Sequence, residues 1–144
     1  MGFTTDLLTG LATRWHNAGI AVYQATGAYA ANDIAIVLGV PGQNPAAQIA
    51  LAVYNNGDDA TLSDSTPMVQ VRFRGQNADP VGADDLADAV FDDLQGFTGN
   101  LPNGIRVVFA KRNSTFPLGI DGNGRQERTD NYELTVHRPS AHRE

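Results

Sequence analysis

Residues 66–97 constrain the fold more than any other stretch, because a strand pattern is followed there by a helix pattern. In residues 68–74, Val69, Val71 and Phe73 alternate with polar side chains, which is the two-residue period of a strand with one buried face. After residue 84 the apolar side chains recur at the spacing of an amphipathic helix. That apolar stripe consists of Leu86, Ala89, Val90, Leu94 and Phe97.

The polar face of this predicted helix is acidic and carries Asp84, Asp85, Asp88, Asp92 and Asp93. The first three spell an aspartate-rich box like those that hold magnesium in terpene-forming enzymes. Such enzymes are large and all-helical, whereas this helix follows a strand in a chain of 144 residues. We therefore predict a solvated helix face and no metal site. The alternative from the enzyme class is a small divalent-metal-dependent enzyme that uses the carboxylates between residues 84 and 93.

Length and composition limit the remaining possibilities. A chain of 144 residues is long enough for one domain, which we place at residues 1–138 with a flexible tail at 139–144. The net charge of −6 and the pI near 4.8 argue against a nucleic-acid-binding module. The absence of cysteine excludes disulfides and thiolate metal sites. No stretch reaches membrane-spanning length and the start does not read as a secretion signal, so we expect no membrane partner.

The rest of the chain adds one helix and three strands. A helix is expected from Thr4 to about Asn17, ended by Gly19, and further strands at residues 48–54, 105–110 and 131–138. Residues 24–33 and 55–66 are predicted loops, and residues 117–125 an irregular segment. The predicted fold class is α+β, a largely antiparallel sheet of about four strands with two helices packed on one face. Its core is expected to combine Val69, Val71 and Phe73 with Ile49, Leu51, Val53, Leu86, Val90 and Leu94.

Catalytic patterns are missing from the sequence. His16, His137 and His142 lack metal-ligand spacing, and no nucleophile elbow, phosphate-binding loop or dinucleotide fingerprint occurs. The segment that begins at Asp121 starts like a calcium loop but has Gln126 in place of glycine at its sixth position. We predict no catalytic residue, no cofactor and no metal, and hence no enzyme.

Several segments, in order and spacing, resemble one protein family. They are the Val40-Pro41 turn with Pro45 before residues 50–54, Pro67 before residues 69–75, a helix ending near residues 94–96, and residues 117–121 leading through Gly124-Arg125 to Asn131-Tyr132. In these segments the chain resembles the tail terminator (minor capsid) proteins of long-tailed bacteriophages. Residues 24–33 and 55–66 depart from the family pattern.

The resemblance implies a structural virion protein that caps the phage tail tube as a six-membered ring, ends tail polymerisation and provides the head-joining surface. The implied partners are other copies of the chain, the tail tube protein and a head-completion or connector protein, while DNA passes through without specific binding. The implied location is the head-tail junction of the virion, and the host cytoplasm during assembly. The alternative reading is another neck or tail-tube component.

Charge patterning suggests how subunits of such a ring meet. Arg72 and Arg74 alternate with Phe73 and so point away from the core, whereas the acidic helix covers the core side of the sheet. A ring brings these surfaces of neighbouring subunits together, and a cation there offsets the unfavourable position of carboxylates at a helix C-terminus. The alternative is that both surfaces are solvated, or that the acids line the lumen. The predicted subunit interface comprises Arg72, Arg74, Asp85, Asp92 and Asp93.

Overall fold

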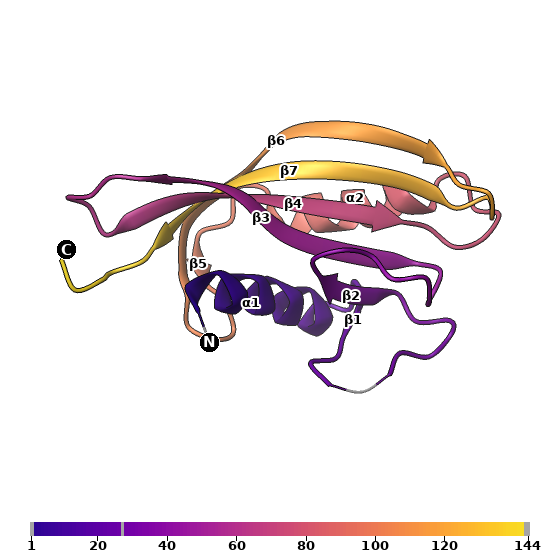
Figure 1. Cartoon of the computed structure of the whole chain (residues 1–144), viewed down its shortest axis with the longest axis horizontal. Helices are drawn as coiled ribbons and strands as arrows, with labels where there is room; N and C mark the ends of the chain where they lie inside the picture. The colour runs from indigo at the N-terminus through magenta and orange to yellow at the C-terminus, as the bar shows by residue number, and fades with distance from the viewer. Residues whose placement is uncertain (1, 27, 143–144) are drawn as a thin grey trace.

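The structure is a computed structural model that describes residues 2–26 and 28–142. It contains two helices and seven strands, drawn in Figure 1. In chain order they are α1 (Phe3–Asn17), β1 (Val22–Tyr23), β2 (Ala35–Leu38), β3 (Gln48–Asp58), β4 (Asp64–Arg74), α2 (Gly82–Leu94), β5 (Gly99–Asn100), β6 (Arg106–Ile120) and β7 (Gln126–His137).

The strands form one curled sheet in the order β1-β2-β3-β4-β7-β6-β5 (Figure 1). β1, β2 and β3 pair in parallel, and all other neighbours are antiparallel. The α+β class is confirmed, but the prediction of about four strands is wrong, since the sheet is mixed and has seven. β1, β2 and β5 are too short to show a periodic sequence pattern, and parallel pairing joins segments that no local signal connects.

Both helices pack on one face of the sheet, as predicted, and share one core with it. Every side chain of the predicted core belongs to this cluster, with Val53 partly buried at its margin. α1 adds Leu7, Leu11 and Trp15, each at most 1% exposed. α1 begins at Phe3 with Gly2 at the N-cap position, not at Thr4, and no side chain caps it. Its end is as predicted, because Gly19 has a φ of 77° and its N–H donates to the His16 carbonyl.

The β3–β4 hairpin is longer than the sequence indicates. Residues 55–66 were expected to be a loop, yet backbone pairing continues to the pair Asp58 and Ser65. A bulge after Val53 shifts the register there. The outer half of β3 has no buried side chain, so its residues show none of the alternation by which a half-buried strand is recognised. Figure 1 shows this hairpin projecting from the body of the molecule.

β6 also extends beyond its predicted limits, through Ile120 into the segment expected to be irregular. Its pairing with β7 is interrupted by register shifts at residues 107–109, 112–114 and 117–119. Each bulge displaces the two-residue alternation, which explains why the sequence pattern breaks down along a continuous strand. Among the described residues, neither helix is both long and apolar enough to cross a membrane.

Candidate functional site

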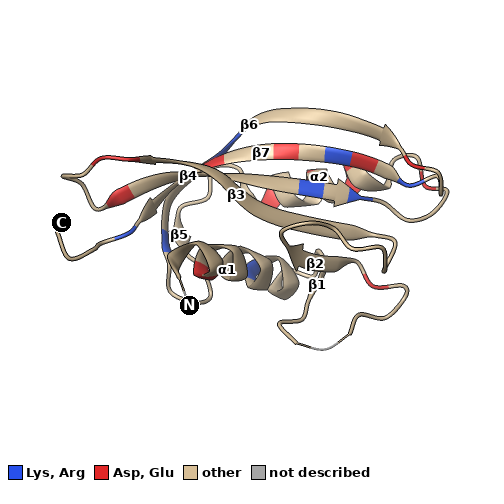
Figure 2. Cartoon of the chain, viewed as in Figure 1, with Lys and Arg blue, Asp and Glu red and all other residues tan. Residues whose placement is uncertain are grey.

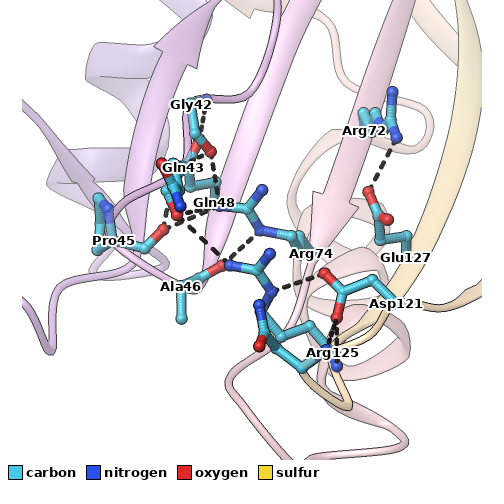
Figure 3. Close-up of polar contacts among 11 residues, drawn as sticks. Gly42, Gln43, Pro45, Ala46, Gln48, Arg72, Arg74, Asp121, Arg125 and Glu127 are labelled. Atoms are coloured by element: carbon cyan, nitrogen blue, oxygen red, sulfur yellow. Dashed lines mark hydrogen bonds and ion pairs between the residues drawn. The ribbon is translucent and has the colours of Figure 1, made fainter.

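Arg74, one of the predicted interface residues, is buried within its own chain. It lies on the face of β4 opposite the core, as its alternation with Phe73 indicates, but it is only 7% exposed. Its Nε donates to the Ala46 carbonyl at 2.7 Å, and its Nη2 donates to the carbonyls of Gly42 at 2.8 Å and Pro45 at 3.0 Å (Figure 3). Burial lowers the pKa of Arg74. The side chain therefore holds the loop before β3 against the sheet.

Gln48 completes this polar contact from β3. Its side-chain amide accepts from the Gly42 N–H at 3.0 Å and donates to the Pro45 carbonyl at 2.9 Å (Figure 3). Carbonyl groups of an irregular loop require donors when they are buried, and a guanidinium supplies several donors in a fixed plane. No local sequence pattern indicates this contact, because Arg74 and the loop carbonyls come from different segments.

Arg72 remains at the surface. Its Nη2 lies 2.9 Å from Glu127 Oε1 of β7, and 41% of its side chain is exposed (Figure 3). Because it sits on the open face of the sheet, Arg72 does not meet the aspartates of α2 in its own chain. The sheet separates the two groups, as the sequence pattern predicted.

The aspartates of α2 divide into two kinds. Asp93 forms an ion pair with Arg14 of α1, with Nε and Oδ2 2.8 Å apart. Asp84 bonds to Gln126 and Arg128 of β7, and the Gln126 hydrogen bond, helped by Arg128, lowers its pKa against the opposing effect of burial. The remaining three, Asp85, Asp88 and Asp92, are exposed and have no ion-pair partner among the described residues.

A buried ion cluster that the sequence reading missed joins α2 to β6 and β7. Asp130 is fully buried and lies 2.8 Å from Nε of Arg128 and 3.3 Å from Nη1 of Arg112. The Arg112 guanidinium also lies 4.2 Å from the ring centroid of Phe91 on α2. The strand alternation could have indicated this cluster, because it places Asp130 on the same inward face as Tyr132 and so puts an aspartate among core positions.

The alternative metal site has no support in this geometry. Within residues 2–26 and 28–142, no group of three or more His, Asp or Glu side chains is placed to hold a metal ion. Asp84 and Asp93, at the two ends of the aspartate series, bond to arginines from different elements. The arrangement supports structural roles for these carboxylates.

Known proteins resemble this chain in sequence and in fold. A family model described as bacteriophage tail terminator protein matches residues 16–138. A chain from a structure entitled virion of native gene transfer agent (GTA) particle has a similar fold, with a TM-score of 0.63 and 16% sequence identity. That match covers 95% of this chain and 99% of the other. A search of curated protein sequences finds no match.

The family match extends over both main hairpins, α2 and the buried ion cluster. Members of this family are structural components of the virion and are not enzymes. The resemblance identified from the sequence is therefore confirmed, and the chain belongs to the bacteriophage tail terminator protein family.

Proposed function

We propose that this chain caps the phage tail tube as a ring of six copies, ends tail polymerisation and provides the surface to which the head is joined. The observation that carries this proposal is the family match over residues 16–138. The partners in this proposal are neighbouring copies, the tail tube protein and a head-completion or connector protein. The place of action is the head-tail junction of the virion, reached after assembly in the host cytoplasm.

The charge of the chain agrees with a channel through which DNA passes. A net charge of −6 disfavours binding to the phosphate backbone, so an acidic ring would let DNA move without retaining it. Exposed Asp85, Asp88 and Asp92 supply part of that charge on a surface of α2 that no described residue neutralises.

The charged contact between subunits is part of the same proposal, but fewer of the predicted residues take part in it directly. Arg72, Asp85 and Asp92 are the members of the predicted set whose side chains a neighbour can reach. Arg74 and Asp93 take part indirectly, because each is engaged within its own chain and positions the element that carries the contact. In a head-to-tail ring the β3–β4 side of one copy meets the β6–α2 side of the next.

Electron microscopy of assembling tails tests the function. Tail tube protein assembled in the presence of this chain should give tubes of uniform length, each ended by a ring. Assembly without it should give tubes that continue to grow. Native mass measurement of the tube-free chain reports whether the ring forms alone. Tubes of the same length distribution with and without the chain, and no ring at their ends, would refute the proposal.

A further inference from the structure

β6 carries an apolar surface that its own chain does not cover. Its exposed large apolar side chains are Val108, Phe109, Phe116, Leu118 and Ile120. These are five of the nine large apolar side chains that are exposed in the described chain, so more than half of them lie on one strand. Their concentration on one strand distinguishes them from singly scattered apolar side chains, which need no partner.

The backbone edge of the same strand is open over part of its length. At its start β6 is covered, because β5 pairs with Arg106 and Val107, and the Gly96 N–H donates to the Ala110 carbonyl at 2.7 Å. Gln95 Oε1 likewise accepts from the Arg112 N–H at 2.7 Å. Over residues 113–120 β7 lies on one side, and none of the described strands lies on the other. An open strand edge with exposed apolar side chains favours association with another chain.

A second open edge lies across the sheet, on β3. β2 pairs with β3 only as far as Leu51, so residues 52–58 have β4 on one side and no described strand on the other. The hairpin that contains this edge projects beyond the body (Figure 1) and exposes Tyr54 and Leu62. In the sheet order β4 and β7 separate β3 from β6, so the two open edges of one chain do not meet.

β6 and the hairpin carry opposite charge, and the basic residues of β6 lie just before its open stretch. β6 contains Arg106, Lys111 and Arg112 and no acidic residue, while residues 52–64 contain Asp58, Asp59 and Asp64 and no basic residue. Figure 2 shows the acidic segments on the projecting hairpin. Pairing of β6 with β6 of another copy would be isologous and would end at a dimer, whereas pairing of β6 with the hairpin is heterologous and brings the exposed Lys111 toward an acidic segment.

We infer that the β3–β4 hairpin of one copy lies along β6 of the next copy and is the main lateral contact of the ring. Two different surfaces meet in this contact, so it is heterologous and repeats from copy to copy until the rotation closes. The inference rests on the proposed ring, whose contact surfaces it names. The inference also agrees with the proposed contact between Arg72 and the aspartates of α2 in the next copy. Arg72 lies on β4, which belongs to the hairpin, and α2 lies beside β6, where Phe91 contacts Arg112.

Cross-linking tests the contact directly, because the chain has no cysteine of its own. The variant Asn56→Cys with Thr115→Cys places one thiol on the hairpin and one on β6, both at exposed positions. With a short bismaleimide it should give a ladder of covalent oligomers that ends at the ring, while each single variant stops at dimers. The matched control is Asn56→Cys with Asn17→Cys, which moves the second thiol to the exposed end of α1.

Substitution of the apolar surface gives a second readout. Phe116→Ser with Leu118→Ser should raise the concentration for half-assembly at least about tenfold, since interface energy concentrates in a few apolar anchors. Val40→Ser, at a position 84% exposed in another loop, should leave that concentration unchanged. Lys111→Glu should weaken assembly, and Asp58→Lys in the same chain should restore part of it at low salt.

The outcomes separate this inference from the proposed function. Rings that form normally in the Phe116 and Leu118 variant, with no more cross-linking at Asn56 and Thr115 than in the control pair, would overturn the hairpin contact and leave the terminator function standing. Failure of the unsubstituted chain to form rings, alone or on tail tubes, would overturn the function. A cross-linked ladder without closed rings would support the contact and count against the ring.

Discussion

Arg14 of α1 and Asp93 of α2 are 79 positions apart in the sequence, and their Nε and Oδ2 atoms lie 2.8 Å apart in the fold. The Arg14 guanidinium also lies 3.8 Å from the ring centroid of Phe97. A carboxylate near a helix C-terminus is unfavourable, and a cation beside it offsets that cost. The cation that the sequence led us to expect from a neighbouring subunit is thus supplied to Asp93 by its own chain.

Arg14→Ala should lower the free energy of unfolding by about 1 to 2 kcal/mol, because it removes a partly buried ion pair and a cation–π contact together. Urea unfolding followed by circular dichroism measures the loss. Arg106→Ala is the control, since Arg106 is exposed and has no ion pair among the described residues, and should change stability by less than about 0.5 kcal/mol. Equal losses in the two variants would contradict the assigned role of Arg14.

Phe73→Ala should lower the free energy of unfolding by about 3 to 5 kcal/mol, because Phe73 is fully buried between β4 and the helices and its truncation leaves a cavity. Phe116→Ala is a matched control with the same change at a ring 53% exposed. Denaturant unfolding of dilute, unassembled protein compares the two. A loss below about 1 kcal/mol for Phe73→Ala would mean that this face of β4 is not the core face.

Arg74→Met should lower the free energy of unfolding by about 2 to 3 kcal/mol, because the loop carbonyls at residues 42–46 lose their charged donor. Backbone amide hydrogen exchange of residues 42–48 should also be faster in this variant. Arg72→Met removes a half-exposed guanidinium from the same strand and should cost less than about 1 kcal/mol. Unchanged exchange in the loop of Arg74→Met would show that the loop is held by other contacts.

Stability should fall in acid partly through Asp84. Its pKa is lowered in the folded chain, so its contribution is complete above the unfolded value of about 4 and is lost as the pH falls through the folded value. Asp84→Asn should therefore cost less than about 1 kcal/mol at pH 7, since the side chain is 44% exposed, and nothing below about pH 2. Thermal unfolding at both pH values measures this. Asp88→Asn removes an exposed carboxylate of the same helix that has no ion pair among the described residues, and serves as the control.

Arg72→Glu should hinder ring assembly at low salt, and Asp92→Arg in the same chain should restore part of it. Each exposed pair is worth only about 0 to 1 kcal/mol, so the effect depends on repetition around the ring and should weaken as salt is added. Light scattering across a salt series measures assembly. Asp93 is left unchanged because its substitution would break the Arg14 pair. Assembly of Arg72→Glu equal to that of the unsubstituted chain at low salt would remove Arg72 from the interface.

Sequence patterns alone were sufficient to predict the elements whose side chains repeat with a clear period. The alternation around Phe73 and the stripe from Leu86 to Leu94 both predicted the buried face correctly, because burial on one face acts on every second residue of a strand and every third or fourth of a helix. The motif order also indicated the tail terminator family, which the family match confirms.

Which charged side chains remain available to a partner depends on how the elements pack together. Arg74 and Asp93 have the same surface-facing pattern in the sequence as Arg72 and Asp92, yet the first two are engaged within the chain. Their partners, the carbonyls before β3 and Arg14 of α1, come from distant segments. Side-chain periodicity indicates which way a residue points relative to its own element. The groups that the residue meets depend on how separate elements pack. The open edges of β3 and β6 likewise depend on which strands pair, and no local pattern predicts them.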